Sequence, residues 1–184
     1  MKRSNLLFFV LTMIFISLGC EKEKCTECTN PQKTEFTGKC TPVKEINPGT
    51  VEVLPSGKIL VTGTSDEWYD SASIALVTGQ SFWYGNRVME ADFSSADFWG
   101  TAVINVGVKN EGDPVLGKWE LIWEVTLTGG VFDPETGSFS EGIIKGEACG
   151  TGVSGNVEGM FGHWTYTMDL SKEGIYYYEG YIIK

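Results

Sequence analysis

The chain has 184 residues, and its 24 acidic and 14 basic side chains give a formal net charge of −10 at pH 7. Nucleic-acid binding depends largely on Lys and Arg that neutralise phosphates, so this acidic composition argues against a nucleic-acid partner. The length suits one domain of ordinary size with a single hydrophobic core.

The first twenty residues have the three-part layout of a secretory signal. Two basic residues come first, the run from Leu6 to Leu18 is almost wholly apolar, and the small residue Gly19 directly precedes Cys20. The apolar run is about thirteen residues long, whereas a helix needs about twenty to cross the hydrocarbon core of a membrane. We therefore expect residues 1–19 to be a signal peptide rather than a permanent membrane span.

The sequence Ser17-Leu18-Gly19-Cys20 resembles the lipobox of bacterial lipoproteins, in which the cysteine is diacylated and becomes the first residue of the mature chain. Ser17 departs from the pattern, because the family prefers an aliphatic residue at that position. The resemblance implies a stable membrane anchor at Cys20, since two acyl chains hold a protein firmly at a bilayer. It also implies a place in the cell envelope, and the charged run at residues 21–24 indicates the outer membrane. The alternative is a secreted protein in which Cys20 joins a disulfide.

Four further cysteines, an even number in an exported chain, favour disulfides. They can pair in three ways, and we expect Cys25 with Cys28 and Cys40 with Cys149, since the second bridge would fix the N-terminal segment to the domain. The Cys25-Thr-Glu-Cys28 spacing also occurs in zinc and redox sites. A zinc site needs a second close pair, and a redox motif needs a strand-to-helix turn. We predict no metal and no cofactor.

The composition changes near Pro48. Residues 20–48 are polar and carry three prolines, which predicts a flexible lipid-anchored tether, whereas residues 49–184 show strand patterns separated by turn residues. The clearest strand is Trp119 to Thr128, where Trp119, Trp123 and three aliphatic residues alternate with polar ones. A period of two places these apolar groups on one face.

A second long strand is predicted from Met160 to Leu170, with Trp164 and Tyr166 on its apolar face. Asp133-Pro134-Glu135-Thr136-Gly137 predicts a hairpin connection. The window from residue 65 to 81 has room for one short helix. Weaker strands are expected at residues 58–64, 73–78, 87–93, 101–108, 139–149 and 176–183. Consecutive strands with short turns predict an all-β antiparallel meander, closed into a barrel of about eight strands.

Glycines are concentrated near residue 150. Gly150-Thr-Gly152-Val-Ser-Gly155 matches the letters of a dinucleotide-binding loop, but no helix is predicted after it to receive a pyrophosphate. We instead expect these glycines to let strands bend or pack closely.

Several short motifs resemble the allene oxide cyclase-like group of β-barrels, over roughly residues 87–184. They are Gly117-Lys-Trp119, Gly129-Gly130, and Ala148-Cys-Gly150-Thr-Gly152 followed by Gly155 and Gly159. The resemblance implies an antiparallel barrel of about eight strands around a central cavity, a shape shared with lipocalin-like proteins. No catalytic position of the cyclases matches a residue of this chain, and a fold alone does not imply a function.

Candidate catalytic groups are sparse. His163 is the single histidine and falls on the polar face of its strand, without a Cys or Ser partner nearby. Glu120 and Glu124 share the polar face of their strand, where we expect them to be solvated rather than an acid/base pair. The acidic group Asp66-Glu67 with Asp70 lacks the spacing of a calcium loop and predicts a solvated loop.

Aromatic residues are the remaining signal. We expect Trp119, Trp123, Trp164 and Tyr166 to face the lumen, where they either form the core or line a site for a small hydrophobic ligand. Trp68, Trp83 and Trp99 fall near predicted loops, where exposed indoles could contact a glycan or a protein partner.

Three functions therefore stand side by side. The first is a lipid-anchored, non-enzymatic barrel that binds a small hydrophobic ligand or serves as a surface module. The second is a cyclase- or isomerase-like enzyme that works in the lumen, and the third is an envelope protein that binds a glycan or a protein.

Overall fold

The computed structural model describes residues 32–133, 135, 138–172 and 174–184. In these ranges the chain forms nine strands and one short 3-10 helix: β1 (Lys33–Asn47), β2 (Thr50–Val53), β3 (Ile59–Ala72), η1 (Ala75–Val77), β4 (Gly79–Met89), β5 (Ser95–Val106), β6 (Gly117–Asp133), β7 (Ser138–Gly155), β8 (Phe161–Asp169) and β9 (Tyr176–Ile183). Within them, no helix has the length and apolar character needed to cross a lipid bilayer.

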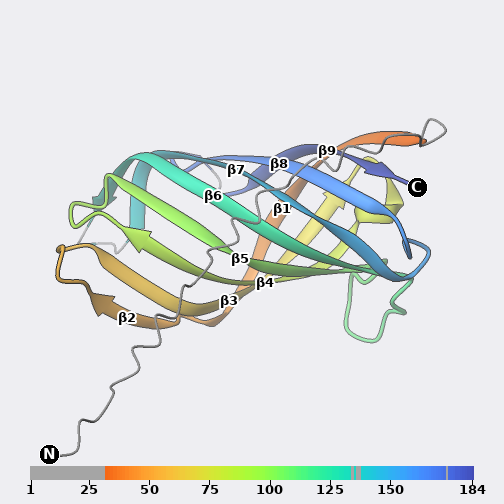
Figure 1. The fold of residues 1–184 in the computed structure, drawn as a ribbon, viewed down its shortest axis with the longest axis horizontal. Coiled ribbons are helices and arrows are strands. Elements are labelled where there is room, and N and C mark those ends of the chain that lie inside the picture. Colours follow the sequence, from red (N-terminus) through yellow and green to blue (C-terminus); the bar gives the residue numbers. More distant parts are fainter. Residues whose placement is uncertain (1–31, 134, 136–137, 173) are drawn as a thin grey trace, which may run out of the picture.

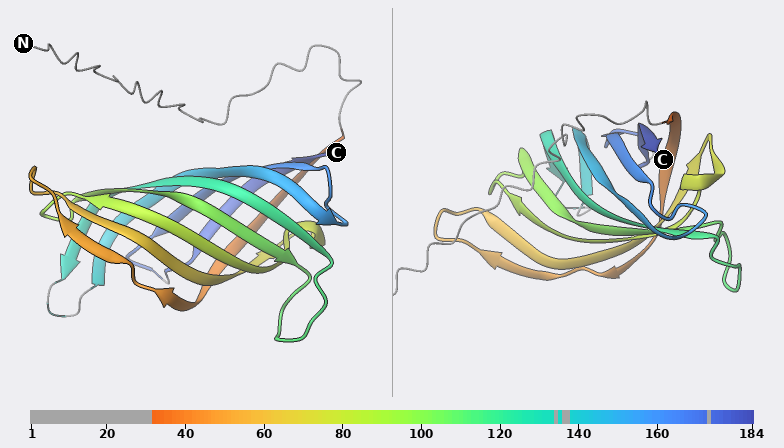
Figure 2. Two further views of the ribbon diagram at one scale, coloured as in Figure 1. Left: turned by 60° about the horizontal axis from the view of Figure 1, so that its bottom comes forward. Right: turned by 45° about the vertical axis from the view of Figure 1, so that its right-hand side comes forward.

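The strands form one antiparallel sheet that closes on itself. Neighbours in sequence pair from β3 through β9, and β1 then pairs with β9 along its first half and with β3 along its second half. The result is a ring of eight strands, to which β2 adds along the first part of β3. The predicted all-β antiparallel meander and eight-stranded barrel are thus confirmed, and the strands tilt around a common interior (Figures 1 and 2).

The prediction of a tether up to residue 48 is wrong for residues 33–47, because this segment is β1 and completes the ring. Its inner face carries few large apolar groups, chiefly Phe36 and Cys40, so the alternation was too sparse to predict a strand. Pro42 lacks an N–H for the ladder and lies at a break in the β1–β3 register, as a proline within a sheet usually does.

Alternation along β6 and β8 is as predicted. Trp119 and Leu127 of β6 and Trp164 of β8 are buried in the interior, and the residues that alternate with the inward-facing ones face outward. The strand between these two, β7, presents small residues to the interior: Gly146, Ala148, Gly150 and Gly152. Small residues on β7 therefore leave room for the indoles of its neighbours, a large-and-small alternation that fills barrel interiors.

The glycines near residue 150 have a packing role. Gly150 and Gly152 lie within β7. A Cβ at Gly150 would collide with the backbone carbonyl of Glu120, and a Cβ at Gly152 would collide with that of Val157. The chain continues from Gly155 through a turn into β8, so no helix follows to bind a phosphate. This confirms the expectation of close strand packing.

The connection between β3 and β4 covers one end of the barrel, near the C-terminus (yellow in Figure 1). Residues 73–78, predicted as a strand, instead contain η1, and Val77 is fully buried against the interior. The indole Nε1 of Trp119 donates a 2.8 Å hydrogen bond to the Leu76 carbonyl. This bond ties the cover to the core. The predicted short helix in the window 65–81 is therefore present only as this single 3-10 turn.

At the opposite end, a ring cluster joins two hairpins. Phe93 and Phe132 stack with centroids 4.4 Å apart, and Phe139 packs edge-on against both. Asp133 ends β6 and Ser138 begins β7, which confirms the predicted hairpin connection between them.

Candidate functional site

The barrel interior contains two packed clusters with a cavity of about 170 Å³ associated with both. The side chains of Trp68, Trp123 and Tyr176 pack against both clusters and also line the cavity. The cavity is similar in size to an apolar cavity of roughly 150 Å³ that binds benzene, and it is smaller than the 300–1,000 Å³ typical of pockets for drug-sized ligands. It therefore has room for about one ring.

Six aromatic side chains form most of the cavity wall: Trp68, Trp83, Phe98, Trp123, Tyr166 and Tyr176. Five of them form a continuous series of ring contacts with centroids 5.4 to 6.1 Å apart, in the order Trp123, Trp83, Tyr166, Tyr176, Trp68. Offset and edge-on ring pairs of this kind stabilise one another beyond simple burial. The wall is thus held in place by its own contacts.

The four residues predicted for the lumen divide into two pairs. Trp123 and Tyr166 line the cavity, whereas Trp119 and Trp164 lie in the packed cluster and are completely buried against each other, with ring centroids 5.4 Å apart. All four face the interior, but two of them can reach a molecule in the cavity and two form core.

Trp68 and Trp83 were predicted to lie near loops, and the structure corrects both. They belong to β3 and β4 and point into the barrel, where they line the cavity. Their predicted position near loops is therefore wrong, and glycan binding stays a prediction. Trp99 does face outward on β5 and is 41% exposed.

Polar groups occupy part of the cavity wall. Thr64 and Asn86 already have partners, since the Thr64 hydroxyl donates to the Gly85 carbonyl and the Asn86 side-chain oxygen accepts from the Gly63 N–H. Three other lining residues each carry a buried atom without a hydrogen-bond partner in the described part of the chain: Arg87 Nε, Trp123 Nε1 and Tyr166 Oη. Buried polar atoms are usually paired, so these three are exceptions among the polar groups around the cavity.

Asp66 also lines the cavity and is half-buried. Burial raises the pKa of its carboxyl, the negative charge of Glu45 adds to this rise, and the positive charge of Arg87 opposes it. Asp66 and Arg87 share the cavity without forming an ion pair among the contacts of the described residues. The cavity thus has one positive and one negative group on an aromatic wall.

Asp70 is a second inward-facing carboxyl and is fully buried, although the acidic group to which it belongs was predicted to be a solvated loop. That group lies in β3, with Asp66 and Asp70 inside and Glu67 outside, where Glu67 pairs with Lys44 at 2.9 Å. Carboxylates on opposite faces of a strand cannot share one ion. Among the described residues, no three His, Cys, Asp or Glu side chains lie close enough together to hold a metal.

The surroundings of Asp70 favour its neutral form. Burial raises the pKa of the carboxyl from 3.8 to about 7, and the neighbouring hydroxyls of Ser81 and Tyr178 and the thiol of Cys40 offset part of the rise. The Cys40 thiol lies 3.8 Å from Asp70 Oδ2, and Oδ1 has no partner in the described residues. Burial, followed by the nearby Asp70, also raises the pKa of the Cys40 thiol.

The predicted bridge between Cys40 and Cys149 is wrong, because Cys40 is a free, buried cysteine. Cys40 faces the lumen beside Asp70. Cys149 follows Ala148, an interior residue of β7, so its side chain points to the opposite, outer face of the sheet. The other predicted pair, Cys25 and Cys28, lies outside the described residues, as do residues 1–19 and Cys20.

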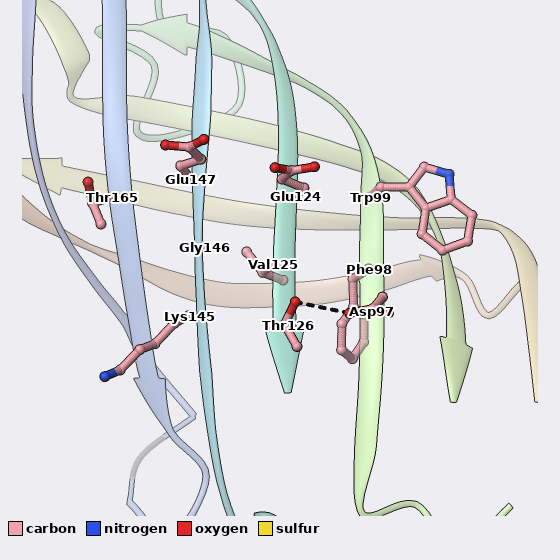
Figure 3. A pocket seen from close by; sticks show the side chains of 10 residues that line it. All are labelled: Asp97, Phe98, Trp99, Glu124, Val125, Thr126, Lys145, Gly146, Glu147 and Thr165. Carbon is pink, nitrogen blue, oxygen red and sulfur yellow. Dashed lines mark hydrogen bonds between the residues drawn. The ribbon is translucent and has the colours of Figure 1, made fainter. Parts of the chain in front are cut away.

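The outer face carries a shallow groove across β5 to β8 (Figure 3). Trp99, Glu124, Glu147 and Thr165 form one transverse row there, because each lies opposite the next in the strand register. Two carboxylates opposite one another repel, and Glu147 Oε2 also lies 2.9 Å from His163 Nε2, within hydrogen-bonding distance. Glu120 and Glu124 are exposed, as predicted, so this face is an open and charged surface.

His163 also lies on the outer face, where its ring stacks on Tyr181 with centroids 5.5 Å apart. Its ion-pair partner Glu147 was not predicted, because the two residues are sixteen positions apart and meet only through the β7–β8 register. Arg87 was also missed. It follows an aromatic run on β4, and only the strand register shows that it points inward.

No known protein family, curated protein or solved structure matches this chain. The similarity to allene oxide cyclase-like barrels therefore stays a prediction, and the function rests on the residues of the barrel itself.

Proposed function

We propose that this protein is a lipid-anchored, non-enzymatic binding protein of the cell envelope, whose barrel binds a small, mostly apolar molecule about one ring in size. The observation that carries the proposal is the cavity of about 170 Å³ with six aromatic side chains on its wall. Interior space next to fully packed clusters is costly, because the atoms around it lose dispersion contacts. A ligand that fills the cavity restores those contacts.

The size of the cavity restricts the ligand. A long acyl chain needs more room, so we expect compounds such as benzyl alcohol and cyclohexanol to bind better than long-chain fatty acids. Aromatic faces on several sides favour flat molecules, which can stack against the indoles.

Tryptophan fluorescence tests this proposal. Titration with benzyl alcohol and cyclohexanol should give a saturable change in emission, because Trp68, Trp83 and Trp123 line the cavity. The Trp123→Phe variant should lose a large part of that change. The matched variant Trp99→Phe, altered on the outer face, should keep it. An emission spectrum that stays constant across the panel contradicts binding in the lumen.

The proposed anchor has its own test. Cys20→Ser should move the protein from the membrane fraction to the soluble fraction, because the residue that would carry the acyl chains is lost. Cys40→Ser is the matched control, since Cys40 is buried in the barrel and should not affect attachment. If Cys20→Ser stays with the membranes, the anchor is elsewhere or absent.

A further inference from the structure

Three residues that line the lumen cavity each carry a buried hydrogen-bonding atom with no partner in the described residues: Arg87 Nε, Trp123 Nε1 and Tyr166 Oη. Each is buried, and each can donate a hydrogen. A buried donor that lacks an acceptor bears the cost of losing its water, so a ligand that supplies acceptor oxygens gains more than a purely apolar one. Because all three groups can donate, they favour a ligand whose polar head accepts hydrogen bonds and donates none.

Arg87 makes the strongest case for a charged head. The chain has two arginines, and Arg3 belongs to the predicted signal peptide, so Arg87 is the single arginine of the expected mature chain. The outer face of this acidic protein carries its positive charge on lysines instead. An arginine placed inside, next to aromatic rings, has the planar donor geometry that fits a carboxylate.

None of the contacts among the described residues neutralises Arg87 directly. No ion pair among the described residues joins it to a carboxylate, although Asp66 lines the same cavity and is close enough for its pKa to respond to the guanidinium. A cationic ligand would use Asp66 and the aromatic faces but would be repelled by Arg87, whereas a carboxylate would be repelled by Asp66 but would gain the planar donors of the guanidinium.

We propose that the lumen ligand is a small ring-containing carboxylate, whose carboxylate binds the Arg87 guanidinium while its ring packs among the indoles. The proposal rests on the proposed function and narrows its ligand class. Hydrogen bonds to a charged partner are roughly twice as strong as neutral ones, so the charged head should dominate the choice among ligands of equal size.

Calorimetric titration of the full-length protein at pH 7 with benzoate, benzyl alcohol and benzylamine separates the possibilities. Benzoate should bind at least about tenfold more tightly than benzyl alcohol. Arg87→Met should weaken benzoate binding by about ten- to a hundredfold and benzyl alcohol binding by a clearly smaller factor. Lys145→Met removes the same charge from the outer groove and should alter neither affinity.

The outcomes distinguish the two proposals. If benzyl alcohol binds but benzoate binds no better, or if benzylamine binds best, the proposal of a carboxylate ligand is wrong, whereas the proposal of lumen binding stands. If neither benzyl alcohol nor benzoate binds, both fail. The Arg87→Lys variant is the control for a folding defect in Arg87→Met. It keeps the positive charge but loses the planar guanidinium, so its benzoate affinity should lie between those of the wild type and Arg87→Met. An Arg87→Lys protein with wild-type benzoate affinity, or one in which benzyl alcohol binding weakens as much as benzoate binding, overturns the assigned role of Arg87.

Discussion

Trp119 and Trp123 lie four residues apart on the same face of the same strand, yet they have different surroundings. Trp119 is completely buried, packs edge-on against Trp164, and donates its indole hydrogen to the Leu76 carbonyl. Trp123 is partly buried, borders the cavity, and has no partner for its buried Nε1 in the described residues. The same residue type therefore serves as core at one level of the barrel and as a binding wall at the next.

The difference between these two levels comes from what faces each indole. The cover formed by η1 and Val77 completes the packing around Trp119. Around Trp123, β3 and β4 contribute Asp66, Gly85 and Arg87 to the cavity wall, which leave space and polar atoms instead of methyl groups. Close packing and complete hydrogen bonding stabilise a fold, whereas space and unpaired donors favour a ligand.

The largest effect should come from Trp119→Ala. The change removes a buried indole and leaves the Leu76 carbonyl without its partner, so we expect the free energy of unfolding to fall by about 3 to 5 kcal/mol. Urea denaturation followed by circular dichroism measures it. Trp99→Ala on the outer face should cost less than about 1 kcal/mol. Equal losses for the two variants would contradict the division between packed interior and open surface.

A pH-dependent effect should follow from Asp70. Its folded-state pKa is raised from 3.8 to about 7, so between these values the folded state binds the proton more tightly than the unfolded state does. Stability should therefore fall as the pH rises from about 4 to about 7 and change little from this cause above that, a total on the order of 4 kcal/mol.

The Asp70→Asn variant isolates this contribution, because the amide has nearly the same shape and does not ionise. The difference in unfolding free energy between wild type and variant should depend on pH in the window from about 4 to 7, with the variant gaining relative stability at the upper end. A difference that stays constant over that window would show that Asp70 has an ordinary pKa.

Sequence alone predicted the parts of the molecule that depend on local alternation. The faces of β6 and β8 were predicted because five or six apolar residues repeat with a period of two. β1 was missed because Phe36 and Cys40 are too few to reveal a period. The positions of Trp83 and Arg87 depend on the register between β3, β4 and β5, which pairs residues far apart in sequence and leaves no local signature.

The cavity itself could not be predicted for the same reason. It exists because side chains from six strands stop short of one another, and the volume left between them is a property of the closed barrel. Alternation shows which side chains enter the interior, and only the three-dimensional packing shows where they fail to fill it.

A smaller effect should come from Gly85→Ala, which directly tests the part of the barrel where the cavity borders Trp123. A Cβ at Gly85 would lie 2.6 Å from Cζ2 of Trp123, so the indole must shift. We expect the affinity for benzyl alcohol to fall by about tenfold, which corresponds to about 1.4 kcal/mol. Unchanged affinity would mean that the ligand does not use the wall formed by Trp123.

The smallest effect should come from His163→Gln on the outer face. The ion pair with Glu147 joins side chains that are 22% and 42% exposed, and such pairs contribute about 0 to 1 kcal/mol. The free energy of unfolding should change by less than about 1 kcal/mol, and ligand affinity should not change, because the pair lies on the far side of the sheet from the cavity. A change in ligand affinity without a change in stability would place the binding site in the outer groove. Since His163 shares β8 with the cavity residue Tyr166 but not its face, this variant tests whether the sheet separates the two sites.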